Sequence, residues 1–190
     1  MIRLYALLFM VTAFVLLACS VYIGTRHTIK HSKLSISIIQ LFVVAIITCV
    51  AYTFAIATHD ARQSEFGYAL YFSGVDWILI TFVFYARQYT KVWLDSYSEP
   101  LITTTIAVLD NISLFTNFKW HHAFLLEPKY LTKDEWFYSF QINDYYYVHL
   151  VFCYILVVII VAILFIKTIQ TSGFHRNRYL SILIMFIGII

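Results

Sequence analysis

The stretch YYYVHLVFCYILVVIIVAILFI, Tyr145–Ile166, decides the fold of this chain. A helix needs about 20 consecutive apolar residues to cross a bilayer core ~30 Å thick. This stretch supplies them, and His149 is its only residue that can carry a charge near neutral pH. We therefore predict that Tyr145–Ile166 is a transmembrane helix.

The rest of the chain repeats this pattern. Only 12% of the 190 residues are charged and 62% are hydrophobic, whereas a soluble domain carries about 25% charged residues. The predicted fold class is an all-α membrane protein, a polytopic helical bundle with five complete transmembrane helices plus a truncated sixth. The other predicted spans are Leu4–Gly24, Leu34–Thr58, Gly67–Ala86, Leu101–Thr116 and the short run Tyr179–Ile190.

The last of these runs is too short to span. At ~1.5 Å per residue it reaches only about 18 Å, and a chain end in lipid would leave unpaired carbonyl groups. We therefore expect residues 1–190 to be a transmembrane domain that is incomplete at its C-terminus.

The distribution of Lys and Arg predicts the orientation, because cytoplasmic loops are enriched in these residues. The second connection has only Arg62 against Asp60 and Glu65. The odd-numbered connections are basic, so we place them in the cytoplasm, the N-terminus outside, and residues 118–144 outside as an aromatic loop. The basic residues concerned are Arg26, Lys30, Lys33, Arg87, Lys91, Lys167, Arg176 and Arg178.

Two segments of this aromatic loop carry possible structure. TNFKWHHAFLLEP, Thr116–Pro128, contains Trp120 and two adjacent histidines. LTKDEWFYSFQ, Leu131–Gln141, has Thr132 as a possible N-cap and Glu135 three residues later, which is a capping box. A short amphipathic helix could form there, lying on the membrane surface or folded over the bundle as a lid, and the alternative is an interfacial anchor.

His121 and His122 do not form a metal pair by themselves, because neighbours on a helix point about 100° apart. A metal or haem would need His149, Asp144 or Glu127 to join them, and nothing in the spacing demands it. Hydrogen-bonding histidines at the interface are favoured, so no metal and no cofactor is expected. The three cysteines, Cys19, Cys49 and Cys153, all lie in apolar runs and are expected to pack as small apolar residues.

Asp76 and Asp110 are the informative charges, because each lies inside a predicted span. A carboxylate there costs ~2.5–3.5 kcal/mol, so it usually faces the bundle interior and has a partner. Asp110, Ser113 and Asn117 have i, i+3, i+7 spacing and share one helical face. This face is either a ligand pocket or coupling network, or polar contact that holds helices together.

The sequence does not contain the residues that several functions require. The net charge of +3, without a basic stripe, argues against nucleic acid. The chain has no lysine in a span for a retinal Schiff base, and no phosphate-binding loop, zinc-protease motif or nucleophile elbow. No catalytic residue is therefore predicted in this chain, and whether it belongs to an enzyme stays open.

The order of these features resembles a known family. It comprises DWILITFVFYARQYTKVW at Asp76–Trp93, LFTNFKWHH at Leu114–His122, the aromatic loop, the Tyr145–Ile166 helix and RNRYLSILI at Arg176–Ile184. The chain resembles the N-terminal seven-helix transmembrane sensory region of bacterial histidine kinases and diguanylate cyclases. The most telling residues are Asn117, His121 and His122.

The resemblance implies a sensory input module in the bacterial cytoplasmic (inner) membrane, multi-pass, that passes an external or membrane signal to a cytoplasmic output domain. Its expected partners are the lipid bilayer, an unknown small ligand and a second copy, joined as a homodimer through the cytoplasmic domain. The ligand-sensing candidates are Asn117, Trp120, His121, His122, His149 and Trp136, and the intramembrane polar network is Asp76, Asp110 and Ser113.

Two rival functions stay open at this point. A transporter or channel would use Asp76 and Asp110 as an ion or proton path. A membrane enzyme or haem protein would use His121, His122 and His149.

Overall fold

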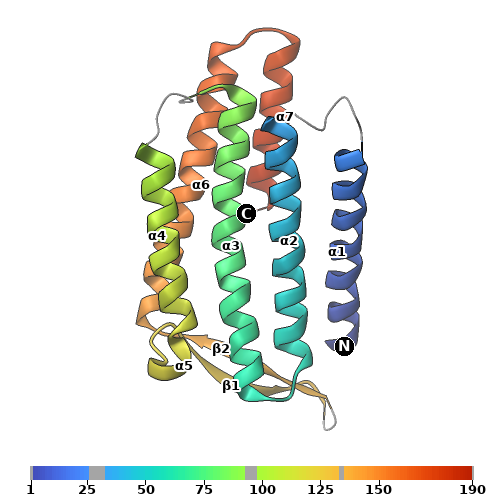
Figure 1. Ribbon diagram of the computed structural model, residues 1–190, viewed down its shortest axis with the longest axis vertical. Coiled ribbons are helices and arrows are strands. Elements are labelled where there is room, and N and C mark those ends of the chain that lie inside the picture. The colour runs from blue at the N-terminus through green and yellow to red at the C-terminus, as the bar shows by residue number, and fades with distance from the viewer. Residues whose placement is uncertain (1, 26–32, 93–97, 133–134, 190) are drawn as a thin grey trace.

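The computed structural model describes residues 2–25, 33–92, 98–132 and 135–189 as a helical bundle with one small sheet (Figure 1). Arg26, Lys30 and Trp93, named above, lie outside the described residues. The elements are α1 (Ile2–Thr25), α2 (Lys33–Ala57), α3 (Ala61–Thr90), α4 (Ser98–Phe115), α5 (Asn117–Trp120), β1 (Phe124–Tyr130), β2 (Trp136–Ile142), α6 (Asp144–Gln170) and α7 (Phe174–Ile189).

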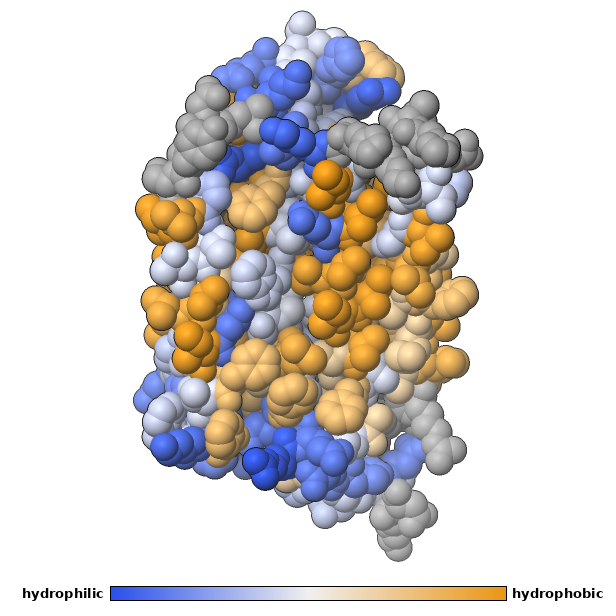
Figure 2. Space-filling view, viewed as in Figure 1, coloured by the Kyte–Doolittle hydropathy of each residue, from blue (hydrophilic) through white to orange (hydrophobic). Residues whose placement is uncertain are grey.

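The prediction of a helical membrane protein is confirmed. Within the described ranges, four helices are long and apolar enough to cross a membrane, namely α1, α2, α3 and α6. Figure 2 shows the result on the surface, where hydrophobic side chains cover the middle of the bundle and hydrophilic ones gather at its two ends. α4 contains a shorter apolar segment, Pro100–Phe115, and α7 has 16 residues, so the expected count of five spans and a truncated sixth stays a prediction.

α3 is the central helix and packs against α2, α4 and α6. It begins at Ala61, before the expected Gly67, because the Asp60 side chain caps it by accepting the Gln63 N–H at 2.8 Å. It ends at Lys91, whose backbone is left-handed and whose N–H donates to the Arg87 carbonyl at 2.8 Å. These caps give α3 its length of 30 residues.

α2 and α3 approach each other through small residues. A Cβ at Gly67 would lie 2.8 Å from the Cα of Ala55, and one at Gly74 would collide with the Thr48 hydroxyl. The buried Ser64 hydroxyl bridges the same contact by donating to the Ala55 carbonyl at 2.8 Å. Small residues permit this backbone approach in membranes, where lipid gives no hydrophobic drive for helix association.

We expect Gly67→Ala to destabilise the bundle by about 1–3 kcal/mol, because the added methyl group must push against backbone atoms of α2. Unfolding of the detergent-solubilised chain, followed by circular dichroism, measures this. Gly188→Ala is the matched control, since a Cβ at Gly188 meets no atom within 4 Å. Equal stability of the two variants would show that the close α2–α3 contact is wrong.

The predicted amphipathic helix in Leu131–Gln141 is wrong. β1 and β2 form an antiparallel hairpin in which Phe124 pairs with Ile142 and Tyr130 with Trp136. The Glu135 N–H does donate to the Thr132 hydroxyl oxygen at 3.0 Å, which is the bond that a helix N-cap would make. Here that bond closes the hairpin turn, and the aromatic residues after it favour a strand that has a partner.

The hairpin lies across one end of the bundle, which we name the hairpin end, and α1 begins at the same end (Figure 1). It is held there by Tyr68 of α3, whose hydroxyl donates to the Tyr138 carbonyl at 2.7 Å. Phe124 and Phe140 pack on Phe72, with ring centroids 5.4 and 5.0 Å apart. A hairpin across the end of the bundle thus stands in place of the expected helix.

The core divides into two apolar clusters. The hairpin-end cluster includes Tyr68, Phe72, Leu114 and Phe124, and the opposite cluster includes Ile80, Val83, Leu156 and Ile160. Asp76 follows Phe72 by one helical turn on α3 and precedes Ile80 by one turn. A carboxyl group therefore lies at the junction between the two clusters.

Candidate functional site

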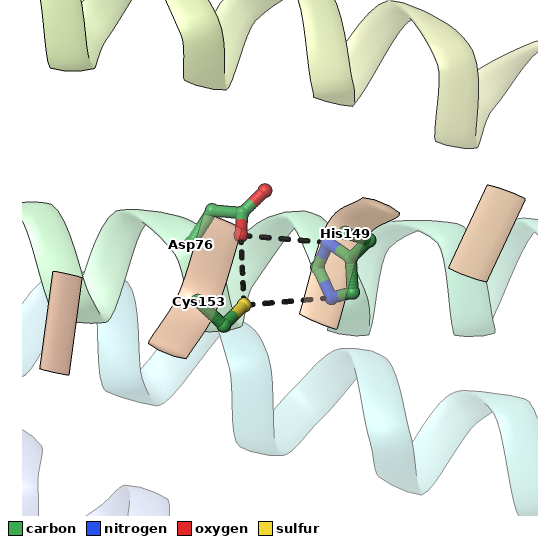
Figure 3. Close-up of side chains that lie close together, drawn as sticks. All are labelled: Asp76, His149 and Cys153. Carbon is green, nitrogen blue, oxygen red and sulfur yellow. Dashed lines mark hydrogen bonds and ion pairs between the residues drawn. The ribbon is translucent and has the colours of Figure 1, made fainter. Parts of the chain in front are cut away.

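Four polar side chains from three helices meet at this junction. We name Asp76 of α3, Asp110 of α4, and His149 and Cys153 of α6 the polar quartet. None is more than 9% exposed. Figure 3 shows Asp76 facing His149 and Cys153 across the contact between α3 and α6.

Short contacts connect the whole quartet. His149 Nδ1 lies 2.7 Å from Asp110 Oδ2 and 3.5 Å from Asp76 Oδ1. The Cys153 thiol donates to Asp76 Oδ1 at 3.3 Å, and its sulfur lies 3.7 Å from His149 Nε2. The charges of Asp76 and Asp110 also interact.

The sequence of α6 explains how its side of the site is built. Tyr145, His149 and Cys153 follow one another at i, i+4 and i+8, so they form one stripe along the helix. The Tyr145 hydroxyl donates to Asp110 Oδ1 at 2.9 Å. The stripe therefore meets both Asp110 and Asp76, and each α6 residue has a carboxylate partner.

The two carboxylates differ in how well they are satisfied. With Asp110 ionised, His149 Nδ1–H and Tyr145 O–H both donate to it, one to each oxygen. Asp76 accepts the thiol on Oδ1, whereas its buried Oδ2 makes no hydrogen bond to the described residues. A buried carboxylate oxygen without a hydrogen-bond donor costs free energy. Asp76 is therefore the less well satisfied of the two carboxylates.

The chemistry of the quartet suits holding a proton or a cation. Two carboxylates, an imidazole and a thiol interact strongly in a dry interior of low dielectric constant. Asp76, His149 and Cys153 each offer a ligand atom, and these atoms all lie within 4.8 Å of one another.

Asn117 organises the turn that joins α4 to the hairpin. Its amide nitrogen donates to Glu65 Oε1 at 2.8 Å and to the Phe124 carbonyl at 2.9 Å. Its amide oxygen accepts the backbone N–H groups of Ala123 at 2.8 Å and Phe124 at 3.2 Å. A fully buried side chain thus satisfies the backbone where the chain reverses.

The predicted stripe Asp110, Ser113 and Asn117 faces inward but does not form one site. Asp110 belongs to the quartet, the Ser113 hydroxyl lies 2.7 Å from His122 Nε2, and Asn117 binds Glu65. The functional role of the stripe stays a prediction.

The three candidate histidines do not converge. His121 is exposed, with Nδ1 3.5 Å from Glu65 Oε1. His122 contacts Ser113, and His149 lies in the quartet. Among the described residues, no shared haem or metal site joins His121 and His122 to His149.

The two candidate tryptophans have different surroundings. Trp120 is 61% exposed at the hairpin end, and its ring centroid lies 6.1 Å from that of His122. Trp136 of β2 packs against His59, in the connection between α2 and α3, at 4.7 Å and against Tyr138 of the same strand at 5.2 Å. Trp120 is thus the more accessible of the two.

A wide, open cavity of about 620 Å³ borders the quartet on the hairpin side. It is lined by His122, Asn143, Asp144, Tyr145 and Val148. Tyr145 is common to the cavity wall and to the hydrogen bonds of Asp110. Tyr145 therefore links this cavity to the buried carboxylates.

Sequence reasoning missed Cys153, Tyr145 and Glu65. Cys19 is exposed and Cys49 half-buried, while Cys153 is buried against carboxyl and imidazole groups. The signal for Cys153 was present, because it follows His149 by four residues, the spacing that puts two ligands on one helical face. Glu65 gave no such signal, since its partner Asn117 is far away in the sequence.

We expect Asn117→Ala to lower the free energy of unfolding by about 2–4 kcal/mol, because buried backbone groups lose their partners. Thermal unfolding in detergent measures it. Asn177→Ala, at an exposed position of α7, should stay within about 0.5 kcal/mol of the parent. A loss no larger than that of the control would contradict the described role of Asn117.

Comparison with known proteins finds one family. The sequence model described as the N-terminal 7TM region of histidine kinase matches residues 6–190. No curated protein and no solved structure matches the chain.

Proposed function

We propose that this chain, which belongs to the family of N-terminal 7TM regions of histidine kinases, senses a signal at its hairpin end and passes it through α6 to a cytoplasmic output domain. One observation carries the proposal. A series of contacts runs from the exposed Trp120 to the half-buried His122, and then through Tyr145 and Asp110 to His149 in the middle of the bundle.

Each step of this series has a defined contact. The Tyr145 N–H donates to the His122 carbonyl at 3.1 Å, and the two rings lie edge to face at 5.1 Å. The Tyr145 hydroxyl then binds Asp110, which binds His149. A ligand that moved His122 would therefore disturb the partner of a buried charge.

The direction of signalling follows from charge. Lys91, Lys167, Arg176 and Arg178 lie near the end opposite the hairpin, where α3 ends and α6 meets α7. Basic residues favour the cytoplasmic side, so we place the hairpin and the start of α1 outside the cytoplasm. The proposed location is the bacterial inner membrane.

α7 is the element that would receive a shift of α6. The two helices are joined by a short turn, 171–173, and pack against each other. α7 also contacts α3 through Phe82 and Phe186 at 4.8 Å and through Tyr89 and Tyr179 at 5.3 Å. Two packings of α6 that differ by a few kcal/mol would be repopulated by a ligand with different affinities for them.

The output is proposed from the family alone. It is a histidine kinase, or by the broader resemblance a diguanylate cyclase, working as a homodimer through that cytoplasmic domain. The stimulus is proposed to be a small ligand or a change in the membrane.

We expect Tyr145→Phe to shift the signalling output several-fold in a protein that joins this region to its output domain. The variant removes one hydrogen bond from a buried carboxylate, worth about 1.5–3 kcal/mol, which is enough to change a two-state population. Kinase autophosphorylation or cyclase product in membranes measures this output.

Tyr154→Phe is the control on the same helix, because Tyr154 is 60% exposed on the apolar face of α6. Trp120→Ala and His121→Ala test the hairpin-end surface in the same assay. If all three variants match Tyr154→Phe in output, with equal membrane insertion, this sensing route is wrong.

A transporter or channel is the second candidate, because Asp76 and Asp110 meet inside the bundle. The opposite apolar cluster, including Ile80, Val83 and Leu156, lies beyond Asp76 toward the basic end. A conducting path would have to cross this cluster, so the arrangement favours a sensor.

We expect proteoliposomes containing the chain to show no proton or cation flux above empty liposomes. A pH-sensitive dye inside the vesicles measures it. Flux that disappears in Asp76→Asn would favour the transporter and count against the sensor.

A further inference from the structure

We infer that the polar quartet binds a divalent transition-metal ion of the Zn²⁺ class. Asp76, His149 and Cys153 would be its ligands, and Asp110 would orient the imidazole from behind. This inference differs from the sequence-based expectation of no metal. It deepens the proposed function by naming a ligand class for the site, and it rests on that function only for its biological meaning.

The distances are those of a site that needs little rearrangement. The Cys153 sulfur lies 3.3 Å from Asp76 Oδ1 and 3.7 Å from His149 Nε2. A tetrahedral ion with bonds of about 2.0–2.3 Å to oxygen, nitrogen and sulfur has ligands roughly 3.3–3.8 Å apart. These two separations fit tetrahedral coordination, and one ligand atom of each of the three residues lies within 4.8 Å of the others. Three protein ligands leave the fourth position for water or an incoming group.

His149 is prepared for metal binding by its neighbour. Asp110 takes the hydrogen bond of Nδ1 at 2.7 Å, so the neutral ring carries its lone pair on Nε2, the nitrogen next to the Cys153 sulfur. Metal-binding histidines usually give their other N–H to a carboxylate in this way, which fixes the tautomer and strengthens the ligand. Tyr145 holds the second oxygen of Asp110.

The burial and the hydrogen bonds of Asp76 support a bound cation independently of the ligand distances. Asp76 is fully buried, and its Oδ2 makes no hydrogen bond to the described residues. In Figure 3 this second oxygen points away from Cys153. When both carboxyl groups are ionised, the hydrogen bonds that hold the helices together leave Oδ2 of Asp76 without a donor, so Asp76 needs either a proton shared with Asp110 or a bound cation. The sulfur and imidazole groups beside Asp76 Oδ1 are the ligands that a cation would use.

The charges balance when the ion binds. The Cys153 thiol and the Asp76–Asp110 carboxyl pair each release a proton to solvent, and the resulting thiolate and the Asp76 carboxylate together neutralise the two positive charges of the ion. A neutral first sphere suits a site inside a membrane. The mixed sulfur, nitrogen and oxygen ligands select Zn²⁺ or similar ions over Mg²⁺ and Ca²⁺, which prefer oxygen alone.

An ion would have a route to the site. The cavity at the hairpin end is lined by His122 and Asp144, whose groups attract a cation, and it ends at Tyr145. The Tyr145 hydroxyl binds Asp110, so Tyr145 belongs both to the cavity wall and to the surroundings of the quartet.

The test measures binding directly. The chain is purified in nanodiscs under reducing conditions, stripped with a chelator, incubated with Zn²⁺ or Co²⁺, and desalted. We expect about one ion per chain by elemental analysis, and in the Co²⁺ form an intense near-ultraviolet sulfur-to-metal charge-transfer band, as thiolate coordination requires. A wild-type chain that retains no stoichiometric ion overturns the inference without any variant.

Variants assign the ligands. Cys153→Ser should remove the charge-transfer band, while Cys49→Ser, a half-buried cysteine of α2 outside the quartet, should keep it. His149→Gln and Asp76→Asn should each abolish stoichiometric binding, and Asp110→Asn should weaken affinity by about 10–100-fold, as for other orienting partners. Circular dichroism shows which variants stay folded, and only those are compared.

A charge-transfer band that persists in folded Cys153→Ser, or that is lost in Cys49→Ser, overturns the assignment. Failure of metal binding leaves the signalling proposal standing, because that proposal is tested by the output of Tyr145→Phe. Failure of the signalling test in turn leaves the measured metal affinity unchanged.

Discussion

A carboxylate in the middle of the central helix is the constraint on which the arrangement depends. Asp76 lies where α3 passes from one apolar cluster to the other, and lipid offers it no compensation. It must therefore meet polar groups from other helices. Asp110, His149 and Cys153 supply these polar groups. Their contacts fix the positions of α4 and α6 relative to α3.

The two ends of the bundle differ in the kind of contact that they make around the polar quartet. At the hairpin end, Asn117 satisfies the backbone groups of Ala123 and Phe124 where the hairpin begins, and the hairpin covers the aromatic cluster. At the basic end, α3, α6 and α7 meet through apolar and aromatic side chains. The hairpin end thus joins polar contacts to the surface, and the apolar packing of α3, α6 and α7 lies toward the basic end.

The sequence predicts the membrane class, most helices and the charged residues inside the spans, because lipid imposes length and apolarity on each segment. The sequence-based prediction of a helix fails at Leu131–Gln141. The hydrogen bond between Thr132 and Glu135 can form either in a helix cap or in a hairpin turn, and here it forms in a hairpin turn. It also assigns Cys153 to apolar packing, because composition does not reveal which helix faces Asp76. Partners distant in sequence, such as Glu65 and Asn117, follow only from tertiary structure.

The stripe of α6 brings these features together. Tyr145 meets the surface cavity, His149 meets Asp110, and Cys153 meets Asp76, all within two turns of one helix. An event at the cavity and an event at the buried carboxylates therefore act on the same rigid element. Since α6 packs on α7, the proposed occupation of the quartet would need only to favour one position of α6 for a signal to reach α7.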